Sequence, residues 1–242
     1  NSNKIKKIYH KKTKLKFYIP NKLNIYRASS FATKEPETLE WIDNFEKDSI
    51  LWDIGSNIGL YSCYAAKTKC KKVFAFEPSF FNLELLSKNI YLNRLSDKII
   101  VIPTPLTNKQ NIEKFNMTST ELGGAISTFG SNISFNGKLF SPTFYYQTIG
   151  NTLNNLSTNY KLQNPDYIKI DVDGVEHLIL EGSTNIISNV KSMLIEVNTD
   201  FKEQFNYVNN FMQNNNFSLD QKYLNKLNIN QSSYNQIWIR NY

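Results

Sequence analysis

The sequence predicts an α/β fold in which a mostly parallel sheet carries helices on both faces. Three observations predict it. Short apolar runs rich in β-branched and aromatic residues alternate with longer amphipathic stretches from residue 50 onward. Two of these runs end in a carboxylate, as strands do at the ligand-binding edge of such a sheet. The chain of 242 residues, 40% hydrophobic and 20% charged, is long enough for one domain with an appendage.

The N-terminal segment, residues 1–34, differs from the rest of the chain in charge. It contains nine lysines and Arg27 but no acid, so the remaining residues carry a net charge of −3 although the whole chain has +7. We assign residues 1–34 to a basic N-terminal extension and residues 35–242 to the main domain. The extension is expected to hold a strand at Leu15–Ile19 that Pro20 ends. Docking of this strand on the sheet and a solvated tail are both left open, and a solvated tail is the commoner case.

The main domain is expected to begin with a helix over residues 38–45, preceded by acids that suit the first turn of a helix. The predicted strands are 50–54, 72–76, 98–102, 166–172 and 190–197, with two closing strands at 217–223 and 236–240. The predicted helices between them are 58–69, 80–92, 175–187 and 200–214. Residues 111–146 hold four of the nine glycines and show no helical period. We predict an inserted β-hairpin or loop excursion there.

Several features bear on the compartment. Two cysteines, Cys63 and Cys70, are too few for a disulfide framework. No apolar run approaches the roughly 18 residues that a membrane-spanning helix needs. The basic start is not followed by the apolar stretch of a signal peptide. We therefore expect a soluble, cytoplasmic protein.

The strongest local signal is an apolar strand that ends in Asp-x-Gly-x-Asn-x-Gly, residues 53–59, and runs into a helix. Such a loop brings a ligand onto the backbone at a strand end and a helix N-terminus. The pyrophosphate of a dinucleotide needs the middle glycine of Gly-x-Gly-x-x-Gly and no anion nearby. Here Asn57 replaces that glycine and Asp53 ends the strand. A carboxylate repels phosphate but accepts an ammonium, so the loop suits S-adenosylmethionine, which carries an ammonium and a sulfonium and no phosphate.

The second signal is Glu77, which lies 22 residues after Gly55 and ends the predicted strand 72–76. A carboxylate at that place accepts hydrogen bonds from both ribose hydroxyls of an adenosine cofactor. Glu77 alone does not distinguish such cofactors, but together with Asp53 it favours S-adenosylmethionine. The alternative is that both acids merely cap the helices that follow them.

The third signal is a run of charged residues at the end of the predicted strand 166–172. On an alternating strand, Lys169, Asp171 and Asp173 share one face. Interior parallel strands are normally apolar on both faces, so this face indicates a catalytic site, with Glu176 close by. The alternative is a structural salt bridge of Lys169 followed by a turn at Asp173. His177 is either a residue of the helix surface or a supporting contact behind the site.

Two further assignments rest on position. Leu106 and Thr107, with Asn108 beside them, follow the predicted strand 98–102 and are placed next to the adenine, although the same residues could form a simple turn. In the excursion, Gly123-Gly124-Ala125 would let the backbone approach the cofactor or the acceptor. A flexible hairpin tip is the alternative there.

These residues occur in motifs that resemble one family in their order along the chain. The motifs are Trp52-Asp53-Ile54-Gly55-Ser56-Asn57-Ile58-Gly59, Phe76-Glu77-Pro78, Lys169-Ile170-Asp171-Val172-Asp173-Gly174-Val175-Glu176, Leu180-Glu181-Gly182 and Leu194-Ile195-Glu196-Val197. From about residue 34 to the end, the chain resembles the FkbM family of S-adenosylmethionine-dependent methyltransferases. The chain departs little from the pattern of the family: Ser56 stands where alanine is usual.

The resemblance implies a class I methyltransferase (Rossmann-like) fold and O-methylation of a hydroxyl on a sugar, glycan or secondary metabolite. It places Asp53, Gly55, Asn57, Gly59 and Glu77 around the cofactor, and we add Glu35, Ser56 and Pro78 from the matched segments. Acceptors vary widely in the family, so the substrate is not transferred with the fold.

Methyl transfer to a hydroxyl requires that the acceptor oxygen is held close to the methyl group and loses its proton. Asp171 or Asp173 is the candidate general base, because their strand is adjacent to the cofactor strand in this topology, and Lys169 is placed to hold a carboxylate or an acceptor oxygen. In the alternative, Asp171, Asp173 and Glu176, with Glu196 or Asn198, bind a magnesium ion that lowers the pKa of the acceptor. We favour the version without metal, since three acids beside a lysine need no extra positive charge.

Two other functions compete with this interpretation. A dinucleotide-dependent oxidoreductase on a similar sheet is disfavoured by the missing middle glycine. A nucleic-acid or anionic-surface binding protein would use the lysines that interleave with Tyr9, Phe17 and Tyr18. No RNA-binding motif is present, so nucleic acid is not favoured as a partner, and peripheral contact with an anionic membrane is kept as an accessory property. The acceptor and the oligomeric state are not determined by the sequence.

Overall fold

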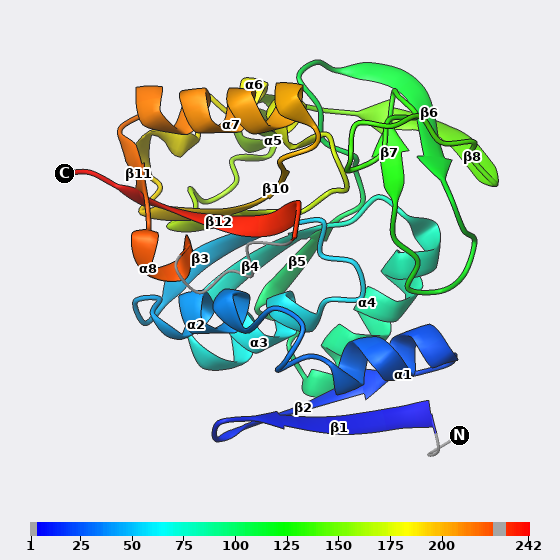
Figure 1. Cartoon of the computed structure of the whole chain (residues 1–242). Helices are drawn as coiled ribbons and strands as arrows, with labels where there is room; N and C mark the ends of the chain where they lie inside the picture. Colours follow the sequence, from blue (N-terminus) through cyan, green and yellow to red (C-terminus); the bar gives the residue numbers. More distant parts are fainter. Residues whose placement is uncertain (1–3, 225–230) are drawn as a thin grey trace. The chain divides into compact units, whose positions relative to one another are not determined.

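The computed structural model describes residues 4–224 and 231–242. The chain forms two compact units. Unit 1 comprises Asn1–Pro103 and Thr120–Gly124, and unit 2 comprises Thr104–Ser119 and Ala125–Tyr242. Figure 1 follows the elements along the chain from blue to red. Within the described ranges, no helix combines the length and the apolar character that crossing a bilayer requires.

Unit 1 is built on three parallel strands with a helix after each of the first two. Its strands are β3 (Ser49–Ile54), β4 (Cys70–Phe76) and β5 (Ile99–Ile102), and its helices here are α2 (Pro36–Asp43), α3 (Leu60–Thr68) and α4 (Phe80–Asn93). Every residue of β3 is buried, as expected for an interior parallel strand. The Trp52 ring packs against Phe74 and Phe76, with centroids 5.9 and 5.6 Å away.

The N-terminal segment is an ordered part of unit 1. It forms the antiparallel hairpin β1 (Ile5–His10) and β2 (Thr13–Tyr18), followed by α1 (Lys22–Ser29). The sequence predicted β2, shifted by one or two residues, but missed β1 and α1. On β2 the alternation of side chains buries Leu15 and Phe17, and the strand contacts α3 and α4 (Figure 1).

Two asparagines of α4 hold β2 by its backbone. The Asn89 and Asn93 side-chain oxygens accept the N–H groups of Tyr18 and Lys16 at 2.8 and 2.9 Å, and the Asn93 amide donates to the Lys16 carbonyl at 2.7 Å. These bonds satisfy backbone groups on the strand edge. Of the two alternatives left open for the extension, the solvated tail therefore does not describe β2, which contacts α3 and α4.

Unit 2 contains parallel and antiparallel pairings. Strand β9 (Tyr167–Ile170) pairs in parallel with β10 (Ser192–Asn198), whereas β12 (Ser233–Arg240) is antiparallel to β10 and to β11 (Phe217–Leu219). Its helices are α5 (Leu153–Tyr160), α6 (Glu176–Glu181), α7 (Lys202–Asn214) and α8 (Gln221–Leu224), with a short 3-10 turn at Ile187–Asn189. The predicted class, an α/β fold with mostly parallel strands, is confirmed.

The excursion forms an antiparallel sheet of its own. Its strands are β6 (Asn111–Met117), β7 (Ser127–Phe129) and β8 (Phe144–Gly150), in the order β7-β6-β8. Residues 120–124, between β6 and β7, belong to unit 1. The excursion thus adds one more strand than a hairpin and extends four residues beyond its predicted end.

Two other predicted elements end earlier in the structure by several residues, and one further helix was not predicted. The helix predicted over 175–187 ends at Glu181, and its C-cap Gly182 packs so closely on Thr107 that an added Cβ would lie 2.6 Å from the Thr107 carbonyl oxygen. The strand predicted over 217–223 ends at Leu219, and Asp220 then accepts the N–H of Lys222 at the start of α8. Helix α5 was missed, although Thr152 caps it by accepting from the Asn155 N–H.

Candidate active site

The loop of residues 55–59 joins β3 to α3 and has three residues in the left-handed region. Gly55, Asn57 and Gly59 have φ values of 79°, 49° and 81°. Glycine reaches this region without steric cost, and asparagine is among the residues that tolerate it best. The carbonyl oxygen of Phe76 accepts the N–H groups of Gly55 and Ser56, each at 3.0 Å, and the Ser56 hydroxyl at 3.2 Å. The motif therefore has residue types that its backbone geometry requires, and β4 anchors the loop.

Glu77 is buried at the end of β4 and joins the loop to α4. One carboxylate oxygen accepts the N–H of Asn57 at 2.8 Å, and the other accepts the N–H of Ser79 at 2.8 Å. Ser79, which follows Pro78, is the N-cap of α4. A carboxylate accepts up to about four hydrogen bonds. The helix-capping and ribose-binding roles considered for Glu77 are therefore compatible with each other.

Asp53 is buried at the end of β3, with 1% of its surface exposed. Its carboxylate accepts a hydrogen bond of 2.5 Å from the Ser62 hydroxyl of α3. Burial, and then the nearby Asp53 charge, raises the pKa of the Cys63 thiol far above its ordinary value. Cys63 is therefore a neutral packing residue. A carboxylate buried beside the loop would attract an ammonium group and repel a phosphate.

Residues 120–124, which we call the strap, are held by side chains of α1 and the residue that precedes it. The Leu122 carbonyl accepts from the Asn21 and Asn24 amides at 2.9 and 2.7 Å, and the Gly123 carbonyl accepts from Arg27 Nε at 2.8 Å. Gly123 has φ 86°, and an added Cβ would lie 2.5 Å from the Asn24 side-chain oxygen. Only glycine fits there.

The strap also meets the loop. The Gly124 carbonyl accepts from the Asn57 amide at 2.9 Å and from the Asn82 amide of α4 at 3.2 Å, and Gly123 N–H donates back to Asn82 at 3.1 Å. The N-terminal segment, the strap and the loop of residues 55–59 therefore form one hydrogen-bonded assembly in unit 1. Strap backbone therefore approaches the predicted cofactor loop, and the approach of Gly123 and Gly124 to the cofactor or the acceptor stays a prediction.

Glu35 is the N-cap residue of α2. Its carboxylate pairs with Lys34 at 2.7 Å and accepts from the Thr38 hydroxyl at 3.4 Å. These contacts describe the entry into α2. The place of Glu35 beside the cofactor stays a prediction.

Leu106 and Thr107 are buried in unit 2, where they form a short backbone bridge. Leu106 pairs with Asn151, and the Thr107 N–H donates to the Asn151 carbonyl at 3.0 Å. Next to them, the Asn108 amide donates to the Glu181 carboxylate at 2.7 Å. The segment is extended rather than a simple turn, and its contact with adenine stays a prediction.

Lys169 is the residue of β9 that departs from the apolar pattern. It is 2% exposed, and its ammonium donates to the Asp171 carboxylate at 2.7 Å. Because burying a cation without a partner is costly, this pairing offsets part of the cost of burying the Lys169 ammonium. The Asp171 side chain is 26% exposed, so it reaches solvent while held by Lys169. The salt bridge of Lys169 that the sequence analysis considered as the structural alternative thus exists in unit 2, and the catalytic role of Asp171 stays a prediction.

Asp173 lies beyond the strand, contrary to the prediction that it shares a strand face with Lys169. Strand β9 ends at Ile170, and Asp173 has φ 64° in the turn that follows. Its carboxylate accepts the N–H of Ile126, next to the strap, at 2.7 Å. The next residue, Gly174, has φ 122° and packs against the backbone of Ser134. The turn replaces the pleat because two successive residues leave the extended conformation.

Glu176 is fully buried at the start of α6. One of its carboxylate oxygens accepts the N–H groups of Val172 and Gly174 at 3.2 and 3.1 Å, and the other accepts the Gln204 amide of α7 at 2.6 Å. Burial raises its pKa to about 7, although these donors act in the opposite direction. Glu176 thus holds the turn that carries Asp173 and does not face solvent.

His177 lies on α6 between two aromatic rings. Its ring centroid is 5.7 Å from that of Phe201 and 6.3 Å from that of Tyr207. Burial lowers its pKa, while the charges of Glu203 and Glu181 act to raise it. Its Nδ1 atom is buried without a hydrogen-bond partner. These contacts pack His177 against Phe201 and Tyr207, and its supporting role behind the site stays a prediction.

The acids considered as magnesium ligands are Asp171, Asp173, Glu176 and Glu196. In residues 4–224 and 231–242, no group of three or more His, Cys, Asp and Glu side chains is arranged to hold a metal ion. Both Glu176 oxygens accept hydrogen bonds from neighbouring donors.

Sequence reasoning missed the residues that hold the site in place. They are Asn21, Asn24, Arg27, Asn82, Ile126 and Gln204. One signal was available, because Asn82 and Asn89 lie seven residues apart on the face of α4 that carries Leu85 and Leu86. Polar residues on a buried helical stripe require partners, but the sequence does not say which.

Comparison with known proteins gives one family match and several relatives. A family model described as the methyltransferase FkbM domain matches residues 53–219. The hexuronic acid methyltransferase AglP of Haloferax volcanii is 28% identical over 183 residues, which cover 75% of this chain and 70% of that protein. Protein arginine N-methyltransferase 1 of Caenorhabditis elegans is 41% identical over 56 residues, or 23% of this chain and 16% of that protein.

Among solved structures, a methyltransferase FkbM from Methylobacillus flagellatus KT superimposes with a TM-score of 0.53 and 14% sequence identity. The alignment covers 81% of this chain and 44% of that one, so this chain spans less than half of the solved protein. This likeness concerns the fold.

Proposed function

Because the chain belongs to the FkbM methyltransferase family, we propose that it is an S-adenosylmethionine-dependent O-methyltransferase acting on a sugar or glycan hydroxyl. The observation that carries the cofactor assignment is the pair of buried carboxylates, Asp53 and Glu77, beside the left-handed loop. Two buried carboxylates at the ends of neighbouring strands disfavour any ligand that would place phosphates beside them. They suit a ligand with an ammonium and free ribose hydroxyls.

In this proposal, residues of unit 1 hold the cofactor. Asp53 attracts the ammonium, Glu77 accepts the ribose hydroxyls, and the loop of Gly55, Asn57 and Gly59 lets backbone approach the ligand closely. The bound cofactor supplies an electrophilic methyl group on a sulfonium. Asn57 and Asn82 keep the strap against the loop through the Gly124 carbonyl, which limits the access of water to this end of unit 1.

Asp171 is the residue proposed to take the acceptor proton. Its carboxylate is 26% exposed and oriented by the Lys169 ammonium, whereas the Asp173 carboxylate accepts the Ile126 N–H and Glu176 is fully buried. A bound S-adenosylmethionine would supply the methyl group, and Asp171 would accept the proton that the acceptor hydroxyl loses. Asp173 and Glu176 then position the turn that follows Asp171.

The acceptor class is proposed from the relative that acts on a hexuronic acid. A sugar that carries a carboxylate is the acceptor to test first, with the corresponding neutral sugars as comparison. A hydroxyl and a carboxylate of such a sugar would give different products, namely a methyl ether and a methyl ester. Mild alkali distinguishes them, because it cleaves the ester and leaves the ether.

The test has two parts. Calorimetry with S-adenosylhomocysteine should give saturable binding, and the binding should weaken at least roughly tenfold in Glu77→Gln because a charged acceptor is lost. Labelled methyl groups from S-adenosylmethionine should then appear on hexuronic acid glycosides in alkali-stable form. The absence of binding at millimolar ligand contradicts the cofactor assignment, and alkali-labile label contradicts O-methylation of a hydroxyl.

A further inference from the structure

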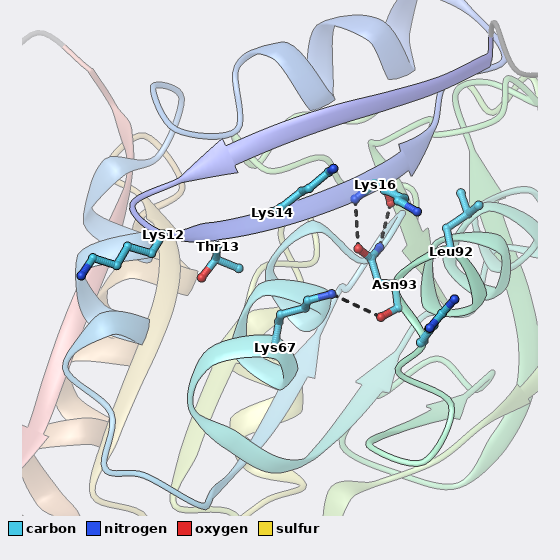
Figure 2. A pocket seen from close by; sticks show the side chains of 8 residues that line it. Lys12, Thr13, Lys14, Lys16, Lys67, Leu92 and Asn93 are labelled. Carbon is cyan, nitrogen blue, oxygen red and sulfur yellow. Dashed lines mark hydrogen bonds between the residues drawn. The ribbon is translucent and has the colours of Figure 1, made fainter.

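A basic groove lies on unit 1 between the N-terminal hairpin and the ends of two helices (Figure 2). Its volume is about 510 Å³. Lys12 comes from the hairpin turn, Lys14 and Lys16 from β2, Lys67 from α3, and Arg94 directly follows α4. The described residues that line it are Lys12, Thr13, Lys14, Lys16, Lys67, Leu92, Asn93 and Arg94.

The five cations of the basic groove are not neutralised by the protein. None of the described residues that line it is acidic, and none of the five cations takes part in an ion pair within residues 4–224 and 231–242. Two other lysines of the same unit, Lys11 and Lys88, do pair with Asp43 and Glu84. The groove therefore has a concentrated positive field that attracts anions.

Two local features of this cluster lower the stability of the folded protein. Lys16 lies directly opposite Lys7 in the hairpin register, and like charges at opposed positions destabilise a strand pair. Arg94 has φ 58° at the end of α4, where glycine is the residue of lowest cost. A binding role for these side chains accounts for both features.

The attraction of cations to helix C-termini explains only part of the groove. Lys67 lies in the last turn of α3 and its ammonium donates to the Asn93 carbonyl at 3.4 Å, as a dipole-complementing residue would. Lys12, Lys14 and Lys16 belong to the hairpin instead. Asn93 fixes the hairpin by bonding both backbone groups of Lys16, so the two walls of the groove are held together.

The groove is remote from the predicted cofactor loop within the same unit. The loop precedes the first turn of α3, and Ser79 caps the first turn of α4, whereas the groove lies at the last turns of both helices. The nine residues of α3, which separate the loop from the groove, span about 13 Å at 1.5 Å per residue, and the Ile58 carbonyl of the loop accepts the Asn89 amide at 2.8 Å, one turn of α4 before Asn93. The groove therefore does not hold the reacting hydroxyl, and a ligand that reaches both places must be an extended molecule.

The chemistry of the groove favours a chain with several separated negative groups. Four of the five cations are lysines, which act as separate point charges, whereas a single dianion is better held by the paired donors of arginine. A hollow surface suits a discrete molecule more than a planar bilayer. Next to the groove, Tyr9 is 64% exposed and lies under Lys14, which offers an aromatic face to a sugar ring.

We infer that the basic groove is a second binding site, which holds a carboxylate-bearing segment of an acidic oligosaccharide. This inference rests on the proposed function, because it assigns to the groove the part of the acceptor that lies away from the methylated sugar. Binding at the groove and binding of the cofactor are nevertheless separate events and are measured separately.

The direct test uses an oligogalacturonate of about ten sugars, labelled with a fluorophore, and fluorescence anisotropy without cofactor. Binding should be lost at high salt, since screening weakens exposed charge interactions. Lys12→Glu combined with Lys14→Glu should weaken it at least roughly tenfold. The control, Lys109→Glu combined with Lys161→Glu, makes the same change in net charge at two exposed lysines outside the groove and should alter binding less than about twofold.

Arg94→Gly separates binding from folding, because glycine suits the left-handed backbone at that position. This variant should bind the oligogalacturonate more weakly while its melting temperature stays the same or rises. Equal loss in the Lys109 and Lys161 control would show a general charge effect and overturn the site. Undiminished binding in both groove variants would overturn it as well.

Competitors identify the source of the anion. Tripolyphosphate that displaces the probe at lower concentration than unlabelled oligogalacturonate would overturn the glycan assignment in favour of a phosphate chain. Stronger binding to vesicles of phosphatidylglycerol and phosphatidylcholine, or to single-stranded RNA, would overturn it in favour of a membrane or a nucleic acid. If S-adenosylhomocysteine does not bind while the groove variants behave as expected, the proposed function fails and the groove remains an oligosaccharide site.

Discussion

The side-chain amide of Asn57 donates a hydrogen bond of 2.9 Å to the carbonyl oxygen of Gly124. Asn57 also has φ 49°, and its side-chain oxygen accepts the N–H of Ile58 at 2.9 Å. The residue therefore provides the left-handed turn of the loop and the link from the loop to the strap. Glycine would provide the left-handed turn but not the hydrogen bond to the strap. This explains physically why asparagine stands where a dinucleotide-binding loop has its middle glycine.

Substitution of Asn57 should separate these two roles. Asn57→Gly keeps the left-handed backbone and loses the link, which should lower the free energy of unfolding by about 1 kcal/mol and weaken S-adenosylhomocysteine binding several-fold. Asn57→Ala should cost roughly 1 kcal/mol more, because alanine is strained at this φ. Chemical denaturation and calorimetry measure both effects. The control is Asn216→Gly, at an exposed asparagine with φ 63°, and equal effects there would contradict the role of the strap link.

The carboxylate of Glu77 should matter both for cofactor binding and for the fold. In Glu77→Gln, one of the two backbone donors, Asn57 or Ser79, would face an amide N–H₂ group instead of an oxygen. We expect S-adenosylhomocysteine binding to weaken at least roughly tenfold, with a loss of stability of about 1 to 3 kcal/mol. Glu84→Gln, at an exposed helix position, should leave both unchanged. A fall in stability without a change in affinity would leave Glu77 with capping as its only role.

Asp171 is expected to act as a base without a metal ion. Asp171→Asn should lower the rate of methyl transfer at least roughly 100-fold, because the amide cannot accept the acceptor proton. Binding of S-adenosylhomocysteine should not change, since the cofactor residues lie elsewhere. Asp166→Asn, which removes the partner of Lys191 next to the start of the same strand, is the matched control.

Chelation tests the alternative role of Asp171. Activity should survive exhaustive treatment with a chelator. Loss of activity that magnesium restores would refute the base mechanism and favour the magnesium site considered for Asp171, Asp173 and Glu176.

Glu176 should make stability depend on pH. Its pKa is raised from 4.5 to about 7, mainly by burial. Between these values the unfolded chain has released a proton that the folded chain retains, so stability falls as pH rises from 4.5 to 7. The full effect is on the order of 3 kcal/mol. His177 has the opposite influence, because its lowered pKa makes protonation below pH 6.5 destabilising.

Glu176→Gln isolates the carboxylate from the histidine. The glutamine side chain cannot ionise, so the melting temperature of the variant should fall less between pH 5 and pH 8 than that of the wild-type protein. The contribution of His177 is the same in the two proteins. Thermal denaturation across this range gives the difference. Parallel curves for the two proteins would show that Glu176 ionises normally.

The N-terminal hairpin should contribute to the stability of unit 1. Phe17 is fully buried on β2, the strand that contacts α3 and α4, so Phe17→Ala should cost about 3 to 5 kcal/mol. Tyr9 is 64% exposed on the other strand of the hairpin, and Tyr9→Ala should cost less than about 0.5 kcal/mol. Urea denaturation compares the two. Equal stability of both variants would indicate that the hairpin is dispensable for the fold.

Local chemistry made the central part of this fold predictable. Strands β3 and β4 and helix α4 lie within two residues of their predicted bounds. A continuous apolar run is typical of an interior strand, and an amphipathic stretch is typical of a helix. The extension was harder to interpret. On β2, lysines alternate with Leu15 and Phe17, so composition suggested a solvated tail while the period of two indicated a buried face. Burial of that face required α3 and α4.

By itself, the sequence determined the residue types of the loop after β3, the carboxylates that end β3 and β4, and the order of motifs along the chain. These follow from backbone sterics and charge, which act within a few residues. Only the tertiary structure decided that Asp173 lies in a turn, that Glu176 bonds to Gln204, and that the strap is held by Asn24, Arg27 and Asn57. Hydrogen-bonding side chains do not specify their partners until the fold brings distant segments within about 3 Å.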